Sequence, residues 1–347
     1  MSSLYNISVK SIKRQTEKSV QIFFDIPQEL ESEFQYKPGQ YITLSKDIDG
    51  EEVRRSYSVC TTPNEGIAVV VKAIEDGIFS NYVNNHLKAG DSIKAMPPEG
   101  HFVIERQAEN SNYCAFVAGS GITPVMSLVK SVLSSNSTSK FILVYGNKSP
   151  DQTIFFNELL DLQKKFPERL FIENVYSETQ QDNAQFGRIE KPTVNYTLKN
   201  KYKGIDFQTY FLCGPEPMIE NIQNILKENG VEDSTIKYEL FYSEKGDKDI
   251  ENTDGKTKLK VISDDEEYEF MMDQDDVILN AILEKDIDVP YSCQGGICSS
   301  CLAQIKEGEA EMRKNQILTD EEVKQGLILT CQAQPTTATV IVDYDDV

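Results

Sequence analysis

The sequence predicts a multidomain protein: an antiparallel β-barrel, then an α/β domain with a parallel sheet, then a small β-grasp domain. Three observations support this order. Short β-runs separated by turn residues fill the chain from Tyr5 to about Arg106, and strands alternate with helices from Asn112 onward. A cysteine cluster then follows a charged segment that is poor in apolar residues. We expect the domains at residues 1–108, 109–243 and 257–347, with a linker at 244–256.

The composition limits the classes of function. The 347 residues are enough for two or three domains. A net charge of -21 argues against nucleic acids and anionic membranes as partners. No apolar run approaches the length of a membrane span, and Met1 to Lys18 lacks the apolar core of a signal peptide. We therefore expect a cytoplasmic protein in which Cys60, Cys114 and Cys213 are reduced thiols.

The other four cysteines have a specific spacing. Cys293, Cys298 and Cys301 follow the pattern C-x4-C-x2-C, and Cys331 stands about thirty residues further on, which is the ligand set of a plant-type [2Fe-2S] cluster. Two glycines in the first interval give the loop freedom to aim three thiolates at one core. A structural zinc site and a disulfide framework are alternatives. Zinc sites usually pair two C-x2-C halves, however, and disulfide frameworks belong to small secreted chains.

The C-terminal region is strongly acidic. Residues 256–347 hold 20 Asp and Glu against 8 Lys and Arg, a net charge of -12. An acidic face on a small electron carrier steers it toward a basic partner, whereas an ordinary solvated surface only keeps the protein in solution. The sequence leaves both interpretations open. Because an iron–sulfur centre passes single electrons, we expect an electron-acceptor protein as a partner.

The N-terminal region contains a candidate cofactor strand. The expected strands are Val20–Ile26, Tyr41–Leu44, Ser56–Cys60 and Ile67–Lys72, and the expected helix is Ser80–Leu87. Arg55 and Tyr57 share one face of a strand, followed by Ser58. An Arg can clamp a pyrophosphate, a Tyr ring can cover a flavin, and a Ser hydroxyl can reach a ring nitrogen. A plain exposed strand is the alternative interpretation.

The start of the expected helix offers a second candidate. Gly77 and Ser80 stand where free helix N–H groups accept a phosphate. Ser80 as a simple N-cap is the alternative, and the sequence does not separate the two.

The central region predicts a dinucleotide crevice. A buried strand, Tyr113–Ala118, leads into the turn Gly119-Ser-Gly121-Ile-Thr-Pro124 and then the helix Met126–Leu133. The turn is not G-x-G-x-x-G, so it differs from the usual dehydrogenase fingerprint. Further elements are expected at Phe141–Tyr145, Phe155–Phe166, Leu170–Val175 and Thr209–Cys213, then in a helix to Asn229. Beyond the linker we expect strands Leu259–Ile262 and Glu267–Met271 and helix Val277–Glu284.

Four motifs appear together in one order. Arg55-Ser-Tyr-Ser58, Gly119 to Pro124, Cys213-Gly-Pro215 and the four cysteines resemble the ferredoxin–NADP reductase superfamily fused to a C-terminal ferredoxin. Shorter stretches, such as Pro98-Glu-Gly-His-Phe102, resemble the reductase subunits of phenylacetyl-CoA epoxidases. The resemblance implies FAD, NADPH or NADH as the electron donor, and a di-iron oxygenase as the acceptor.

The resemblance also implies site residues. For the flavin these are Arg55, Ser56, Tyr57, Ser58, Val71, Lys72, Ala73, Gly77 and Ser80, with Lys72 and Ala73 offering backbone groups to a phosphate and Ser80 binding the pyrophosphate. For the nicotinamide dinucleotide they are Gly119, Gly121, Thr123, Pro124, Cys213, Gly214, Pro215 and Glu216, and Phe241 would lie near the flavin. Cys293, Cys298, Cys301 and Cys331 would hold the cluster.

One position departs from the family pattern. Plant-type reductases have an Arg that holds the 2'-phosphate of NADPH, and this chain has Glu178 after Ser177 there. A carboxylate should repel that phosphate. Lys148 and Arg188 are alternative partners, so the sequence favours NADPH only slightly.

The combined interpretation is an electron-transfer flavoenzyme in which NAD(P)H reduces FAD and the cluster passes electrons to an oxygenase. No catalytic side chain is expected, because the cofactors carry the chemistry. Three alternatives remain: the same electron chain serving a Rieske dioxygenase, a desaturase or the hybrid-cluster protein; a redox-sensing module; and a dehydrogenase of a small organic substrate.

Overall fold

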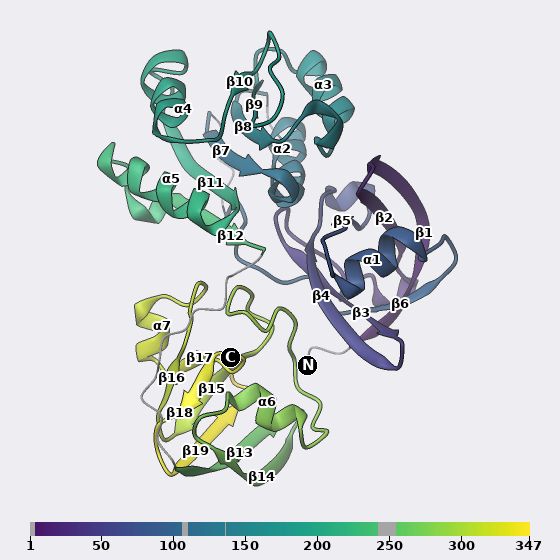
Figure 1. Cartoon of the computed structure of the whole chain (residues 1–347), viewed down its shortest axis with the longest axis vertical. Coiled ribbons are helices and arrows are strands. Elements are labelled where there is room, and N and C mark those ends of the chain that lie inside the picture. Colours follow the sequence, from purple (N-terminus) through teal and green to yellow (C-terminus); the bar gives the residue numbers. More distant parts are fainter. Residues whose placement is uncertain (1–3, 106–109, 136, 242–254) are drawn as a thin grey trace. The chain divides into compact units, whose positions relative to one another are not determined.

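The computed structural model describes residues 4–105, 110–135, 137–241 and 255–347 (Figure 1). Most of the expected linker 244–256 lies outside the described residues. The described part contains three larger sheets and a two-stranded ribbon. The first two sheets lie in one compact unit and the third in another. No helix among the described residues has both the length and the apolar character needed to cross a membrane.

The first sheet is the expected antiparallel barrel. Its strands are β1 (Tyr5–Thr16), β2 (Ser19–Asp25), β3 (Tyr41–Ile48), β4 (Glu51–Ser58), β5 (Ala68–Lys72) and β6 (Ser92–Ala95), in the order β4-β3-β6-β1-β2-β5. The end of β4 returns to β5 through the bridge Val59–Val69, and the Cys60 N–H donates to the Ala68 carbonyl at 2.9 Å. These contacts close the sheet, which leaves no unpaired edge between β4 and β5.

The helix of this sheet starts earlier than expected. Helix α1 (Ile78–Asn85) has Gly77 as its N-cap, so the interpretation of Ser80 as the N-cap is wrong. Ser80 lies inside the first turn instead. Its hydroxyl donates to the Gly77 carbonyl at 3.3 Å and accepts the Ile74 N–H at 3.3 Å. Gly77 is in an extended conformation suited to a cap, and the Ser80 side chain folds back to brace the preceding loop.

The second sheet is entirely parallel. Its strands are β10 (Gln185–Phe186), β9 (Leu170–Tyr176), β8 (Phe141–Asn147), β7 (Asn112–Ala118), β11 (Phe207–Gly214) and β12 (Ile236–Leu240), in that order. Helices α2 (Ile122–Ser135) and α3 (Phe156–Lys165) cover one face, and α4 (Lys191–Asn195) and α5 (Glu216–Glu228) the other (Figure 1). The strand order reverses beside β7, and ligands of such sheets bind at the carboxyl ends of the strands at this point.

Short helices complete these two sheets. They are the 3₁₀ turns η1 (Gln28–Leu30), η2 (Pro63–Glu65), η3 (Gly119–Gly121), η4 (Pro150–Gln152) and η6 (Asp233–Thr235) and the π-helical segment η5 (Tyr196–Lys201). One hydrophobic core runs from barrel residues such as Cys60, Val70 and Phe102 to α2 and β7. The rings of Phe102 and Phe211 meet edge to face, with centroids 5.2 Å apart. The barrel and the parallel sheet therefore share buried apolar surface.

The third sheet has the expected β-grasp character. Its strands are β14 (Glu266–Asp273), β13 (Lys256–Ser263), β19 (Thr339–Asp343), β15 (Leu302–Glu307) and β17 (Leu327–Leu329), in that order, with the ribbon β16 (Ala310–Met312)–β18 (Ala333–Pro335) and helices α6 (Ile278–Leu283) and α7 (Asp320–Lys324). Strands β13 and β19 are parallel, and their other neighbours are antiparallel. Lys256, the last residue of the expected linker, already belongs to β13, where its amino group pairs with Asp273 at 3.0 Å.

Candidate functional site

Two of the predicted motifs meet at the carboxyl ends of β7 and β11. The turn η3 follows β7 and runs directly into α2, with Gly119 at φ 55°. A Cβ on Gly121 would lie 2.2 Å from the Cys213 carbonyl oxygen, so only glycine allows this approach. Helix α2 begins directly after this turn, at Ile122, and the N–H groups in the first turn of a helix can bind an anion. This geometry fits an anionic dinucleotide.

The remaining residues of the two motifs frame this turn. The Thr123 hydroxyl donates to the Ser120 carbonyl at 3.0 Å, and Pro124 occupies the first turn of α2. On the other side, Pro215 is the N-cap of α5 and Glu216 is its first residue. Thr123 therefore braces the turn through its side chain.

A lysine from the barrel reaches the same turn. A Cβ on Gly119 would lie 3.8 Å from the Lys72 amino nitrogen. Burial lowers the pKa of Lys72, and the nearby charges of Lys148 and Lys18 lower it further. The cause is three cations gathered at one crevice, which favours an anion there. The Ala73 N–H already donates to the Lys18 carbonyl at 2.7 Å, so the Lys72 amino group is the better phosphate ligand of the two residues.

The flavin strand places its residues as the alternation predicts. Arg55 is exposed, and the Tyr57 ring packs beside Phe79 with centroids 5.7 Å apart. Ser56 points to the opposite side of β4 from these two. Ser58 is 3% exposed and its hydroxyl donates to Glu239 Oε2 at 2.9 Å. The strand is thus joined by this hydrogen bond to β12 of the parallel sheet.

Glu239 is a site residue that the sequence analysis missed. It stands opposite Cys213 in the pairing of β11 and β12. Burial raises the pKa of Glu239 to about 7, although the hydrogen bond from Ser58 acts in the other direction. Burial, and then the Glu239 charge, raise the pKa of the Cys213 thiol. The signal was the one acidic residue of β12, two positions before Phe241 and next to the buried Leu240.

Two of the other expected flavin residues, Val71 and Gly77, contact α1, and a third, Phe241, follows β12. The Val71 carbonyl accepts a hydrogen bond from the Asn84 amide at 3.1 Å, which ties β5 to α1. Gly77 caps that helix, and a Cβ on it would lie 2.4 Å from the Ser80 hydroxyl. Phe241 lies one residue beyond β12, with 39% of its surface exposed.

The loops after β8 and β9 carry the charges expected to discriminate NADPH from NADH. The Lys148 amino group pairs with Glu178 Oε1 at 3.0 Å, with more than half of both side chains exposed. The Glu178 N–H also donates to the Lys148 carbonyl at 3.0 Å. Lys148 is therefore already paired with the carboxylate that would repel a 2'-phosphate.

The four predicted cluster ligands come together in the third sheet. Hydrogen bonds from Cys298 and then Cys331 hold the pKa of the Cys293 thiol well below its usual range. The contact with Cys293 raises the pKa of Cys298, and contacts with Cys293 and Cys301 raise that of Cys331. These opposite shifts come from contacts among the thiols, which bring the four cysteines to one place. This arrangement fits a cluster that neutralises several thiolates.

The loop around these thiols is braced by its neighbours. Gly296 has φ 70°, and a Cβ on it would lie 2.9 Å from the Lys314 carbonyl oxygen. The Gly295 N–H donates to Cys293 Sγ at 3.4 Å, and the Gln332 amide donates to the Gln294 carbonyl at 3.0 Å. No three His, Cys, Asp or Glu side chains in the described ranges are arranged to hold a metal ion. A [2Fe-2S] core differs from one ion in dividing its four cysteines between two irons.

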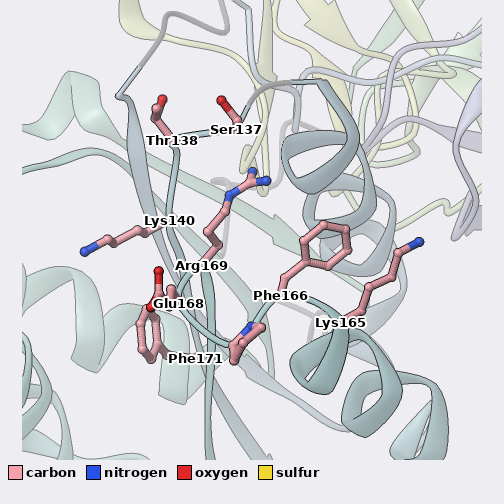
Figure 2. A pocket seen from close by; sticks show the side chains of 9 residues that line it. Ser137, Thr138, Lys140, Lys165, Phe166, Glu168, Arg169 and Phe171 are labelled. Carbon is pink, nitrogen blue, oxygen red and sulfur yellow. The ribbon is translucent and has the colours of Figure 1, made fainter.

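A separate hollow of about 630 Å³ lies at the amino ends of β8 and β9, at the opposite end of the strands from the nucleotide turn (Figure 2). It is lined by Ser137, Thr138, Lys140, Lys165, Phe166, Pro167, Glu168, Arg169 and Phe171. The Arg169 guanidinium donates to the carbonyls of Val132, Leu133 and Ser139 and packs over the Phe166 ring at 5.5 Å. Arg169 thereby caps the C-terminal end of α2. The hollow is a structural feature away from the crevice.

Replacing Glu239 with Gln should change the pH dependence of stability. The folded protein holds a proton on Glu239 up to about pH 7, whereas the unfolded chain loses it near the ordinary pKa of 4.5. The wild type therefore loses stability as pH rises from about 4.5 to 7. Gln does not ionise, so no buried charge destabilises the variant at high pH. Its Tm should exceed that of the wild type at pH 8 but not at pH 4.5. Glu178→Gln, an exposed carboxylate in the same sheet domain, is the control, and equal Tm differences at both pH values would contradict the argument.

Comparisons with known proteins agree with this geometry. Three family models match along the chain: the oxidoreductase FAD-binding domain at residues 7–104, the oxidoreductase NAD-binding domain at 116–224, and the 2Fe-2S iron-sulfur cluster binding domain at 261–336. Among solved structures, phthalate dioxygenase reductase has a TM-score of 0.61 at 20% identity and matches 98% of both chains. An intact type IV self-sufficient cytochrome P450 monooxygenase has a TM-score of 0.72 over 98% of this chain and 41% of its own. At these identities the structures show a shared fold.

Relatives with clearer sequence similarity show the family. The E component of 1,2-phenylacetyl-CoA epoxidase from Escherichia coli (strain K12) is 36% identical, and the match covers 99% of both chains. The ferredoxin reductase component of 3-ketosteroid-9-alpha-monooxygenase from Rhodococcus rhodochrous is 32% identical over 97% of this chain and 96% of its own. The barrel, the parallel sheet and the cysteine loop correspond to the three matched domains. The chain therefore belongs to the reductase components of oxygenases, which are NAD(P)H-dependent oxidoreductases of the ferredoxin–NADP reductase superfamily with FAD-binding, NAD-binding and C-terminal [2Fe-2S] domains.

Proposed function

We propose that this protein is the reductase of a di-iron phenylacetyl-CoA epoxidase and works in phenylacetate catabolism. The observation that carries the proposal is the match to the E component of the Escherichia coli epoxidase, at 36% identity over 99% of both chains. The match includes all three domains, so it covers the electron entry and the electron exit alike. A second acceptor has a specific observation behind it, since the steroid monooxygenase reductase component is 32% identical over 97% of this chain.

A reconstitution experiment tests the acceptor. The purified reductase is mixed with NAD(P)H, phenylacetyl-CoA and either the epoxidase oxygenase subunits or a steroid monooxygenase oxygenase with its own substrate. We expect product only with the epoxidase, at a rate that scales with reductase concentration. Cytochrome c reduction, measured in parallel, shows that the reductase itself is active. If product forms only with the steroid monooxygenase, the epoxidase is not the acceptor and the steroid monooxygenase takes its place in the proposal.

The site residues have distinct proposed roles. When bound, FAD accepts a hydride from the nicotinamide, and the cluster passes the electrons on singly. The start of α2 and the Lys72 amino group would hold the pyrophosphate of the nicotinamide dinucleotide, while Arg55 and the first turn of α1 would hold the flavin phosphates. The close approach of Gly121 to Cys213 holds the nucleotide turn against the end of β11, where the nicotinamide would bind. The Ser58 hydroxyl donates to Glu239 Oε2 at 2.9 Å, and Glu239 stands opposite Cys213.

The proposed division between flavin and cluster predicts the effect of Cys298→Ser. The four cysteines lie within residues 255–347, whereas the barrel is a separate sheet. We expect the variant to lose or destabilise the cluster, seen as loss of its absorbance and its electron paramagnetic resonance signal after reduction. Flavin content and flavin reduction by NAD(P)H should stay near wild type. Loss of the flavin together with the cluster would contradict independent cofactor domains.

The ion pair of Lys148 and Glu178 predicts a change in nucleotide preference. Glu178→Gln removes a repulsive charge and releases Lys148, so the ratio of kcat/KM for NADPH over NADH should rise roughly three- to tenfold. The wild-type ratio, measured in the same assay, shows which nucleotide is preferred. Asp161→Asn, which changes an exposed carboxylate paired with Lys164, is the control. An unchanged ratio in Glu178→Gln would mean that this loop does not face the 2' position.

The acidic C-terminal domain predicts a salt effect on electron delivery. Residues 256–347 carry a net charge of -12, so attraction to a basic acceptor should be screened as ionic strength rises to physiological values, where the Debye length is about 8 Å. Flavin reduction by NAD(P)H should change much less, because its contacts lie within the crevice. Stopped-flow traces of both half-reactions over a salt series separate the two steps. Delivery that does not respond to salt would exclude electrostatic steering.

A further inference from the structure

The middle of helix α2 is attached to the barrel. The Ser127 hydroxyl donates to the Thr61 carbonyl at 2.5 Å, in the loop that follows the flavin strand. A Cβ on Gly39 would lie 3.3 Å from Leu128 Cδ2, so a barrel turn packs closely on the same helix. These contacts lie on the helix whose first residues form the nucleotide turn. The position of that turn relative to the flavin strand therefore depends on how α2 is seated.

Lys130 lies one turn further along the same helix and is only 11% exposed. Its amino group contacts Glu65 Oε1 at 3.1 Å and Glu158 Oε1 at 2.6 Å. Glu65 belongs to η2 of the barrel, and Glu158 to the first turn of α3. The second oxygen of Glu65 accepts the N–H and the hydroxyl of Thr62, at 2.8 and 2.9 Å. Lys130 thus joins three elements, and its barrel partner is itself held in place.

Helix α3 has a second attachment to the barrel. Its N-cap residue, Phe155, has φ 62°, a conformation that bulky residues rarely adopt. The Phe155 N–H donates to Gln15 Oε1 of β1 at 3.3 Å, and the Gln15 amide donates to Gln21 at 2.8 Å. A strained backbone persists only where its surroundings fix it. The first turn of α3 is therefore a fixed point from which Glu158 reaches Lys130.

From these contacts we infer that Lys130 is a positioning residue for hydride transfer. Ser58 lies three residues before Thr61, and Gly121 lies six residues before Ser127, so short rigid segments connect both reacting sites to this attachment. Its two ion-pair partners among the described residues, Glu65 and Glu158, are not assigned to the cofactors. It acts by holding the nucleotide turn in register with the flavin strand. The inference does not depend on which oxygenase accepts the electrons.

The choice of a lysine has a physical reason. Glu65 and Glu158 would repel each other without a cation between them. A buried ion pair adds little net stability compared with apolar packing, but it is satisfied only when the amino group lies between both carboxylates. An apolar contact would tolerate sliding of α2. The ion triad penalises it, which favours one arrangement of the two domains.

The test measures flavin reduction by NAD(P)H in the FAD-loaded full-length protein. In Lys130→Met the limiting rate at saturating nucleotide should fall about tenfold or more, because small misplacements of reacting atoms are costly. The equilibrium Kd for the nucleotide should stay within about twofold, since α2 still presents the same N–H groups. Lys130→Arg should restore most of the rate. Lys164→Met, which removes an exposed lysine of α3 paired with Asp161, is the matched control and should match wild type.

A second measurement separates positioning from simple stabilisation. The triple variant Lys130→Met, Glu65→Gln, Glu158→Gln removes the repulsion and should recover the wild-type Tm while its limiting rate stays low. Hydrogen exchange at the backbone of residues 61–66 should be faster than in wild type in Lys130→Met and in the triple variant. If Lys130→Met does not fold, Glu158→Gln, which keeps the helix and the side-chain shape, should show the same pattern with a smaller fall. A limiting rate per bound flavin equal to wild type, or one that recovers together with Tm, would overturn the inference.

Discussion

The seating of helix α2 on the barrel is the contact on which the rest of the site depends. One helix carries the nucleotide turn at its start, the hydrogen bond from Ser127 to Thr61 in its middle, and Lys130 one turn later. The apolar core continues across the same contact, from Val70 and Phe102 into α2 and β7. Domains that share only polar surface usually move relative to one another. Here the shared core and the ion triad favour a single arrangement, which suits a reaction that depends on the distance between two rings.

Next to this contact, burial shifts the pKa values of two ionisable side chains. Glu239 sits on β12 opposite Cys213, and burial raises its pKa to about 7. Lys72, from the barrel, has its pKa lowered by burial and by neighbouring lysines. Burial of these two ionisable groups lowers the stability of the fold, and groups with such shifted pKa values are concentrated at functional sites. Glu239 accepts a hydrogen bond from Ser58 of the barrel, and Lys72 of the barrel lies near the nucleotide turn, so both sheets contribute ionisable groups to the site.

The cluster loop follows a different physical rule. Its ligands come from one loop and one neighbouring segment, and its geometry is set by backbone conformation: Gly296 has φ 70° and packs against the Lys314 carbonyl. Contacts among the thiols hold the pKa of Cys293 low and raise those of Cys298 and Cys331, so the loop already brings these side chains together. Local spacing is sufficient for this site, because a tight loop and one distant cysteine determine it. The nucleotide crevice needs three elements that are far apart in sequence.

The sequence by itself determined the fold class, the three-domain order and the four cysteines, since each rests on a local pattern: β-runs, a strand–glycine turn–helix unit, and C-x4-C-x2-C spacing. It placed the helix α1 two residues late, because the cap is set by the backbone of Gly77 and not by the Ser80 hydroxyl. It missed Glu239, and it gave no role to Lys130. These residues act through partners 181 and 65 positions away, Ser58 and Glu65. Only tertiary packing brings such pairs into contact, because burial and charge proximity are properties of the folded chain and leave no periodic pattern in the sequence.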